Sequence, residues 1–513
     1  MEKNSKIVSK EGFKTQIRPA LKKKGGVIAL CHGCFDLVHP GHLIHFQQAK
    51  EICDILVVSV TAAKYVRKGP GRPYFDDETR LNYLASFECI DYVILSESYI
   101  VDDIIEAVEP DFYVKGSEYK KEDEDITGMI RVERELVEKH GGKIYFTGGA
   151  VYSSTKLINT ALPGLSDDVR THMESYVKDH TLDDILGYAE KASELCALVV
   201  GDIIIDRYSY CEIHGLINKD AVYSSRLDNT EDYAGGSAAI ARAVSSFAKS
   251  VTLLGAVGSD DLDKEIKDSL PDNCRAELLY SSDRPTIVKH KFLTRNGKRD
   301  EYRKFFATHN IPKIPRYEDK LRAELRKRLE SLMKDVDVVF LCDFGHGLLD
   351  RDTLELIQEK APYLVLNCQT NSANRGLNII TKYHKADVFC LDQEELQLAY
   401  PDLFGDEEGS FRTLGEHLDS TGFLTQGSSG ASVVDKDRNI ISCPALTLHV
   451  KDTIGAGDAF YSVAGMFMAA GAPVETGLLM GNIGGALAAN IVGNKEAVEK
   501  VNVLKYAGTL MNV

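Results

Sequence analysis

Two glycines flank an alanine immediately before an aspartate and an apolar run in the C-terminal part of the chain. Gly455, Ala456 and Gly457 have little or no side chain, so their backbone N–H groups can approach an anion closely. Residues 459–470 predict a helix that begins at this turn, and a helix N-terminus favours negative charge. Asp458 could accept a proton from an attacking hydroxyl. A simple cap with Asp458 as N-cap explains one glycine and one aspartate only, so the whole string favours phosphoryl transfer.

A second candidate centre follows the first predicted strand, residues 26–31. His39 and His42 stand three residues apart at the start of a helical pattern over residues 41–53. At this spacing both rings lie on one side of the helix and face the loop above the strand. Two imidazoles with backbone N–H groups can hold the phosphates of a nucleotide. The alternatives are solvated histidines or a metal site with His45, although no carboxylate or cysteine completes such a site.

Alternating strands and helices must position both centres. A further predicted strand at residues 56–60 follows the first helix, and a strand–helix–strand unit implies a parallel sheet. Residues 197–205 begin a second alternation of buried strands and helices. Ligands of such sheets bind at the carboxyl ends of the strands. The predicted fold class is therefore α/β with two domains.

Composition limits the function further. A chain of 513 residues is too long for one ordinary core, and its 44% hydrophobic and 27% charged residues are typical of a globular protein. The net charge of −16 argues against a nucleic-acid or membrane-surface role. There is no apolar run of transmembrane length and no apolar region of a signal peptide, so we expect a cytoplasmic protein. The 11 scattered cysteines are expected to be reduced.

The string from Lys451 to Phe460 resembles the signature of the ribokinase-like (PfkB) sugar kinases. The resemblance implies a doubly wound sheet with a small β lid, and a reaction that uses ATP and Mg²⁺. It makes Asp458 the base and Gly455 to Gly457 an anion hole and part of the nucleotide site. The other implied site residues are Asp206, Gly235 and Gly236 for the sugar, Thr425 and Gly427 for ATP, and Glu395 for Mg²⁺ through water.

Three positions depart from the pattern of these kinases. Ala239 stands near the place of a usual asparagine, His346 replaces a common lysine and Asp392 replaces an asparagine. Residues 210–226 are expected to form part of the lid, through which we expect a homo-oligomer.

A hairpin is predicted over residues 286–305, with its turn at Asn296 and Gly297. Its basic side chains, Lys289, Lys291 and Arg303, could only solubilise the sheet or could contact an already phosphorylated sugar.

The segment Gly33-Cys34-Phe35-Asp36, followed by His39-Pro40-Gly41-His42, resembles the G-x-F-D-x-x-H-x-G-H signature of the cytidylyltransferase-like nucleotidylyltransferases. The resemblance covers about residues 26–159 and implies a Rossmann-like domain. It makes His39, His42 and Lys115 catalytic, and assigns nucleotide contacts to Gly33, Phe35, Ser154 and Thr155. Weaker matches are Lys68-Gly69 and Arg80, whereas Ala63 lies in a stretch that lacks the aspartate of many relatives.

The predicted organisation is a leader at 1–25, a nucleotidylyltransferase domain at 26–160, a helical connector at 161–195 and a sugar kinase domain at 196–513. This pair of domains resembles the bifunctional kinase/nucleotidylyltransferases of heptose activation for bacterial surface polysaccharide, in reversed order. The resemblance implies two steps, from a sugar or sugar phosphate to a sugar 1-phosphate and then to an NDP-sugar, with ATP or CTP as nucleotidyl donor. The expected partners are small-molecule sugars and nucleotides, and neither nucleic acid nor membrane.

Two alternatives stay open. One domain could be a ligand-sensing pseudoenzyme that regulates the other, which the substitutions at Ala63, Ala239, His346 and Asp392 would favour. The transferase could instead be a cytidylyltransferase for an alcohol phosphate such as glycerol 3-phosphate.

Overall fold

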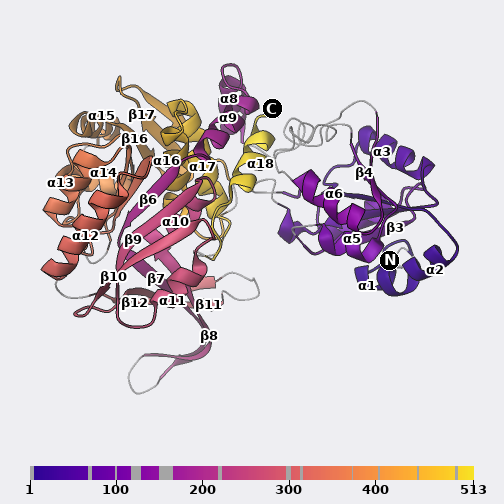
Figure 1. Ribbon diagram of the computed structural model, residues 1–513, viewed down its shortest axis with the longest axis horizontal. Coiled ribbons are helices and arrows are strands. Elements are labelled where there is room, and N and C mark those ends of the chain that lie inside the picture. The colour runs from indigo at the N-terminus through magenta and orange to yellow at the C-terminus, as the bar shows by residue number, and fades with distance from the viewer. Residues whose placement is uncertain are drawn as a thin grey trace. The chain divides into compact units, whose positions relative to one another are not determined.

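The computed structural model describes residues 5–66, 72–98, 101–116, 129–148, 166–217, 222–295, 302–311, 316–371, 374–401, 405–447, 450–491 and 495–512. The chain divides into two compact units, Met1–Met173 with Leu504–Val513 and Glu174–Val503 (Figure 1). The domain boundaries drawn from the sequence, at residues 25, 160 and 195, stay a proposal. The α/β class is confirmed, since both units contain parallel sheets.

The N-terminal unit contains a five-stranded parallel sheet in the order β3-β2-β1-β4-β5. Its strands are β1 Ile28–Gly33, β2 Ile55–Thr61, β3 Tyr92–Ser96, β4 Phe112–Lys115 and β5 Lys143–Phe146. Successive residues of β1 enter opposite cores, Ala29 and Cys31 on one face, Ile28 and Leu30 on the other. This double burial explains why β1 reads as a continuous apolar run.

Helices cover both faces of this sheet. The elements around it are α1 Lys10–Gly12, the π-helical turn η1 Phe13–Ile17, α2 Arg18–Lys23, α3 Pro40–Glu51, the 3₁₀ turn η2 Ala63–Tyr65, α4 Asp77–Ala85, α5 Asp102–Val108 and α6 Met129–Lys139. Phe46 of α3 and Leu84 of α4 pack on the face of Ala29, and Ile104 of α5 packs on the other. Phe13, within the segment predicted as a leader, is fully buried in this second core.

The second unit contains a nine-stranded sheet in the order β10-β9-β6-β13-β14-β15-β16-β17-β18. Its strands are β6 Cys196–Gly201, β9 Ser250–Gly258, β10 Cys274–Ser281, β13 Val338–Asp343, β14 Leu364–Cys368, β15 Val388–Asp392, β16 Thr421–Thr425, β17 Ala431–Val434 and β18 Ile440–Cys443. All neighbours pair in parallel except β17, which is antiparallel to both β16 and β18. The carboxyl ends of its parallel strands therefore meet along one edge.

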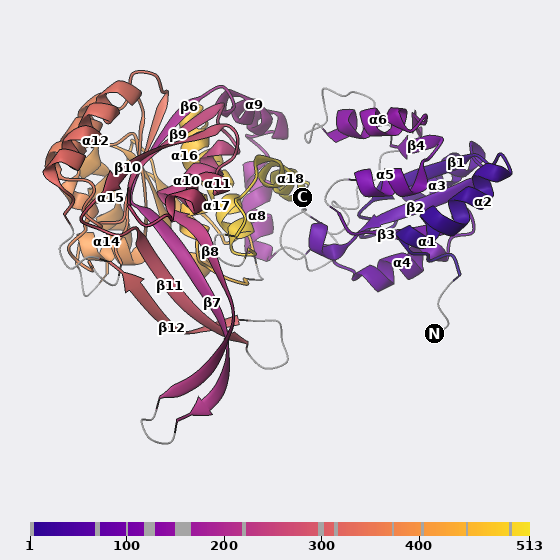
Figure 2. The same cartoon turned by 60° about the horizontal axis from the view of Figure 1, so that its bottom comes forward.

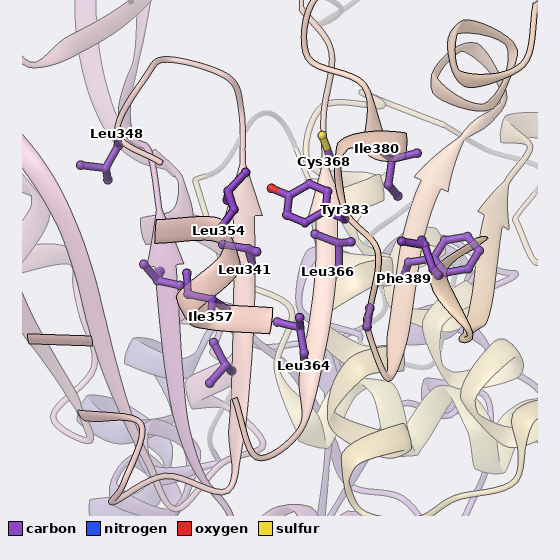
Figure 3. Close-up of a cluster of buried hydrophobic side chains, with 14 of the residues drawn as sticks. Leu341, Leu348, Leu354, Ile357, Leu364, Leu366, Cys368, Ile380, Tyr383 and Phe389 are labelled. Carbon is purple, nitrogen blue, oxygen red and sulfur yellow. The ribbon is translucent and has the colours of Figure 1, made fainter. Parts of the chain in front are cut away.

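Helices pack on both faces of this large sheet (Figure 1). The remaining helices are α8 Asp167–Tyr176, α9 Leu182–Ala192, α10 Ser237–Ser245, α11 Asp263–Ser269, α12 Asp319–Leu332, α13 Arg351–Lys360, α14 Gln393–Ala399, α15 Glu407–Leu418, α16 Ala456–Ala469, α17 Val474–Ala488 and α18 Lys500–Leu510, with 3₁₀ turns η5 Ile380–Lys382 and η6 Gly427–Ser429. Figure 3 shows one core, in which Leu341 and Leu366 of the sheet face Leu354 and Ile357 of α13.

A separate four-stranded sheet, with the order β12-β11-β7-β8, projects from this unit (Figure 2). Its strands are β7 Ile203–Leu216, β8 Tyr223–Gly236, β11 Ile287–Arg295 and β12 Tyr302–Asn310. Of the stretch predicted as part of the lid, residues 210–216 lie in β7 and residues 223–226 lie in β8, and the predicted hairpin is the antiparallel pair β11 and β12. Its turn at Asn296 and Gly297 lies outside the described residues.

Within the described segments, no helix combines the length and the apolar character needed to cross a membrane.

Gly422 gives a test of packing in the large sheet. It pairs directly with Phe389, and a Cβ built on Gly422 lies 1.9 Å from the Phe389 ring. We expect Gly422→Ala to lower the free energy of unfolding by about 1–3 kcal/mol through overpacking. Gly187→Ala in α9 is the control, since its Cβ meets nothing within 4 Å, and should stabilise the helix. Denaturant unfolding of both variants measures the difference, and equal effects would contradict the packing account.

Candidate active sites

The five-stranded sheet of the N-terminal unit reverses its strand order at β1, which lies between β2 and β4. Ligands of open α/β sheets bind outside the carboxyl ends of the strands at such a point. Gly33 ends β1, Lys115 ends β4, and His39 is the N-cap residue of α3. The structure thus places the predicted histidines and Lys115 at the same edge of the sheet.

His39 and His42 form a stacked pair at the start of α3. Their ring centroids lie 3.9 Å apart with an interplanar angle of 28°, and the His39 backbone N–H donates to Nδ1 of His42 at 3.3 Å. Burial lowers the pKa of His39 below 6.5, so its ring is neutral at pH 7 and the stack avoids two adjacent charges. Approach of a polyanion would favour protonation of the His39 ring.

Lys115 supplies a positive charge close to two further histidines of this unit, His32 and His45. Its Nζ lies 2.7 Å from Oε2 of Glu133, a buried residue of α6 that sequence reasoning did not single out. Burial, with the Lys115 charge as a second cause, lowers the pKa of His32 to about 3 and that of His45 to about 4. His45 therefore stays neutral, and its Nδ1 lies 2.7 Å from Oγ1 of Thr147.

Gly33 and Phe35, both predicted to contact a nucleotide, shape the loop beneath the histidines. Phe35 is 9% exposed, and its ring lies 5.5 Å from the His42 ring and 5.3 Å from the Phe46 ring, measured between centroids. A Cβ on Gly33 would lie 3.2 Å from the Phe35 ring. Gly33 therefore leaves room for the Phe35 ring, which makes an edge contact with the His42 ring.

Asp36 of the same motif holds a neighbouring loop. Its Oδ1 accepts the N–H groups of Tyr74 and Phe75 at 2.7 and 3.1 Å, and its Oδ2 lies 3.2 Å from the Arg72 guanidinium. Buried Arg80 donates to the carbonyl of Cys34 at 2.7 Å. Both residues thus order the loop that leads to the histidines.

Ala63 lies in the stretch that was noted above for lacking an aspartate. Its backbone N–H donates to Oδ1 of Asp77 at 2.8 Å. Ser154, Thr155 and the Lys68-Gly69 pair lie outside the described residues.

In the second unit, Asp458 lies in the first turn of α16. Gly455 is the N-cap with φ +79°, in the left-handed region that favours glycine, and a Cβ on Gly457 meets nothing within 4 Å. The helix start is therefore open to an anion. Burial raises the pKa of Asp458, whereas a hydrogen bond of 2.7 Å from Nε2 of Gln369 to Oδ1 acts against this rise.

Asp206 lies near Asp458, on β7 of the projecting sheet. It is 5% exposed, and Nζ of Lys291 donates to its Oδ1 at 2.8 Å. A Cβ on Gly235 would lie 2.3 Å from its Oδ2, so Gly235 makes room for this carboxylate. Gly236 adopts φ +58° as it enters α10.

Lys289 and Lys291 alternate along β11 and point to the same face as Asp206. Burial lowers the pKa of Lys289, while the nearby charges of Asp206 and Asp458 oppose this shift. His309 of β12 faces both lysines, and burial together with their charges lowers its pKa. This strand alternation is the signal by which the sequence could have assigned both lysines to the centre.

Two buried residues, His346 and Arg284, lie near the basic group formed by Lys289, Lys291 and His309. The Arg284 guanidinium carbon lies 4.0 Å above the Tyr317 ring, and its NH2 donates to the His346 carbonyl at 3.1 Å. Burial, with Lys289 and Arg284 nearby, lowers the pKa of His346 to about 4. Nε2 of His346 and both Nε and NH1 of Arg284 are buried without a hydrogen-bond partner in the described part of the chain.

Glu395 accepts backbone N–H groups on both oxygens. Thr370 donates to Oε1 and Asp392 to Oε2, each at 3.0 Å, while Oδ1 of Asp392 accepts the Glu395 N–H at 2.8 Å. Aspartate thus caps α14 as an asparagine would. Thr425 ends β16 and Gly427 follows it, where an added Cβ would meet open space.

The residues present fit a hydrated divalent cation. Burial raises the pKa of Glu395 to about 8, with the charges of Asp392 and Asp458 as further causes, and a cation would relieve this repulsion. Among the described residues, no group of three His, Cys, Asp or Glu has a geometry for holding a metal directly. Contact through water and ATP oxygens matches the preference of Mg²⁺.

Comparison with family models identifies both regions. Residues 196–500 match the pfkB family carbohydrate kinase model, and residues 30–160 match the cytidylyltransferase-like model. Two similar curated proteins are both called Bifunctional protein HldE. The protein of Trichlorobacter lovleyi is 34% identical over 33% of each chain, and that of Shewanella sp. (strain ANA-3) is 26% identical over 59% of this chain and 62% of the relative.

The match thus spans only about a third of the length of the first of these relatives. Among solved structures, phosphofructokinase-2 from Escherichia coli in complex with potassium is 14% identical and aligns over 62% of this chain and 99% of its own, with a TM-score of 0.48.

The raised pKa of Glu395 predicts a pH-dependent stability. Because its pKa lies near 8 when folded and near 4.5 in its ordinary state, ionisation costs stability as pH rises between these values. We expect wild type to lose stability relative to Glu395→Gln from about pH 5 to 8, with little further change above pH 8. Thermal melts across this range measure it.

Glu394→Gln on the same helix is the control, since the Glu394 side chain is 52% exposed. Parallel stability curves for wild type and Glu395→Gln would contradict the prediction.

Proposed function

The chain belongs to the pfkB family of carbohydrate kinases, and from this membership we propose that it is a bifunctional enzyme of sugar activation. Its kinase phosphorylates the anomeric hydroxyl of a sugar phosphate with ATP, and its cytidylyltransferase-like domain converts the product into an NDP-sugar. The observation that carries this proposal is the grouping of Asp458, Asp206 and the two lysines of β11 beside the open start of α16.

In the kinase step, Asp458 takes the proton of the sugar hydroxyl as its oxygen attacks the γ-phosphorus of ATP, and ADP leaves. The backbone at Gly455 to Gly457 stabilises the charge on the transferring group. Glu395 would hold Mg²⁺ through water, and the bound cation would supply positive charge beside the phosphates. Asp206 orients the sugar, because its carboxylate oxygens can accept hydrogen bonds from sugar hydroxyls.

A phosphorylated sugar suits the basic group around Lys289. In the part of the chain that the structure describes, Lys289 forms no ion pair, whereas Lys291 is engaged by Asp206. Arg284, which has buried donors without a hydrogen-bond partner among the described residues, lies near the same group. Lys289 and Arg284 both lower the pKa of His346. Such donors are better satisfied by a phosphate than by a neutral hydroxyl.

In the transferase step, the sugar 1-phosphate attacks the α-phosphorus of ATP or CTP, and pyrophosphate leaves. His39, His42 and Lys115 hold the triphosphate and stabilise its developing charge, with Thr155 as a further contact. No protein nucleophile is needed, because the sugar phosphate is itself the nucleophile. Lys115 would exchange Glu133 for phosphate oxygens when the nucleotide binds.

The long arm of β7 and β8 supports the proposal of a homo-oligomer through the lid. Leu216, Tyr223 and Leu227 are 59%, 67% and 59% exposed on these strands. Apolar side chains gathered on one projecting arm indicate a contact surface.

The two activities should separate by mutation. Asp458→Asn keeps the shape but not the basicity of the carboxylate, and should lower the kinase rate by about 10²–10⁴-fold with transfer to supplied sugar 1-phosphate unchanged. His42→Ala should do the reverse. A panel of aldoses and aldose phosphates with ATP, CTP and Mg²⁺, read by mass spectrometry, measures both steps, and mixing the two variants should restore the NDP-sugar.

Full kinase activity in Asp458→Asn would refute the assigned base. A kinase product that the transferase never consumes would refute the two-step sequence.

Lys289→Met tests the charge of the substrate. Loss of a charged hydrogen bond should raise KM for the preferred sugar phosphate by about 10–100-fold and leave the KM of the unphosphorylated sugar nearly unchanged. Lys267→Met removes an exposed lysine of α11 and is the matched control. Equal effects of Lys289→Met on both sugars would contradict a phosphate subsite.

A further inference from the structure

Gln369 makes a side-chain hydrogen bond to Asp458. It follows the last residue of β14, and its Nε2 donates to Oδ1 of Asp458 at 2.7 Å. An ionised carboxylate can only accept, so the amide nitrogen faces it and not the amide oxygen. The contact joins two segments that lie 89 residues apart in the chain.

The backbone of Gln369 is held on both sides. Its N–H donates to the carbonyl of Asp343 at 2.9 Å, and its carbonyl accepts Nδ2 of Asn378 at 2.9 Å. Nδ2 of Asn378 also donates to the Asp343 carbonyl at 3.1 Å, and Nζ of Lys382 donates to Oδ1 of Asn378 at 2.5 Å. The amide of Gln369 therefore projects from a fixed point.

The Asp343 side chain anchors the same network. Its Oδ2 accepts the Tyr383 hydroxyl at 2.6 Å and forms an ion pair with Lys382. Asp343 and Tyr383 are 3% and 0% exposed, so this support is part of the core beneath the centre. Figure 3 shows Tyr383 beside Cys368, the residue that precedes Gln369.

We propose that Gln369 is a positioning residue for the kinase base, whose carboxylate it holds in one orientation. By occupying Oδ1 it leaves Oδ2 of Asp458 to meet the sugar hydroxyl. The proposal rests on the proposed function, in which Asp458 is the base.

Gln369 is one of several groups that act on this carboxylate. Burial disfavours its charge, and the Gln369 hydrogen bond is the largest opposing influence. Among the described residues, the other titratable groups that act on it are Asp206 of β7, Lys289 and Lys291 of β11, Cys342 of β13, Cys390 of β15, Glu395 of α14 and Tyr461 of α16. These groups are the same in wild type and in the Gln369 variants, so differences among these proteins measure the effect of the Gln369 side chain on Asp458.

The first test is the pH dependence of kcat in the full-length protein, with ATP and the sugar phosphate that the panel identifies. Gln369→Met keeps the length but removes the donor, and Gln369→Glu adds a like charge. The acidic limb of the profile should move to higher pH in the order wild type, Met, Glu. The Met variant should be about tenfold slower on the acidic limb and recover towards pH 9.

Gln358→Met is the control. This buried glutamine of α13 accepts the His384 N–H at 2.8 Å and donates to the Leu354 carbonyl, with no contact to Asp458 among the described residues. It should cost stability without a shift of the limb. An unshifted limb in both Gln369 variants, or a change confined to the KM of the sugar, overturns the proposal.

A second test needs no substrate. Because the pKa of Asp458 is raised, its ionisation costs stability as pH rises, and Gln369 reduces that cost. The loss of Tm in Gln369→Met should therefore grow from pH 5 to pH 8, and the growth should vanish in the Asp458→Asn background. A loss that is the same at every pH and in both backgrounds shows a merely structural role and overturns the proposal.

The two failures are distinguishable. Kinase activity retained in Asp458→Asn refutes the base, and with it the proposed kinase mechanism. An inactive Asp458→Asn with an unshifted Gln369→Met profile refutes the role of Gln369 alone.

Discussion

Buried and half-buried carboxylates on β7 and beside the carboxyl edge of the large sheet lose much of their hydration, and the donors that replace it shape the proposed kinase centre. Lys291 donates to Asp206, Gln369 to Asp458, and two backbone N–H groups to Glu395. The side-chain donors come from different elements from the carboxylates they serve. The projecting sheet, the loop after β14 and α14 are therefore tied to the chemistry, because the loss of any one donor would leave a buried acceptor with less compensation.

Both units carry their candidate centre at the carboxyl ends of parallel strands, but the charges of the two centres differ. In the N-terminal unit, stacked imidazoles and Lys115 lie where the strand order reverses, which suits a triphosphate. In the second unit, carboxylates collect close to lysines, which suits a hydroxyl that must lose its proton beside an anion. Burial keeps His39 neutral in the first centre and raises the pKa of Glu395 in the second, so desolvation acts on both.

Glycines at these edges make room for side chains. A Cβ on Gly235 would collide with the carboxylate of Asp206, and one on Gly33 would press on the Phe35 ring. Gly457 differs, because open space surrounds it at the start of α16. The same residue type thus serves packing at two positions and ligand access at the third.

Features that depend on near neighbours in the chain could be predicted from the sequence alone. Alternating buried strands and helices predicted the α/β class, and the glycine turn before an apolar run predicted a helix start where α16 begins. The spacing of His39 and His42 likewise predicted that they share one side of a helix. These features follow from local periodicity and backbone freedom, which a sequence displays directly.

The meeting of distant groups, in contrast, depends on the tertiary structure. Lys291 reaches Asp206 across 85 residues and Gln369 reaches Asp458 across 89. Strand alternation places Lys291 on one face of β11, but no local pattern identifies its partner or that of Gln369. The parallel pairing of β11 with β7 brings the first pair together, and the order of β13, β14 and β15 in the sheet sets the loop that carries Gln369. Strand order arises from burial of both sheet faces at once, a property of the whole unit that residue spacing does not contain.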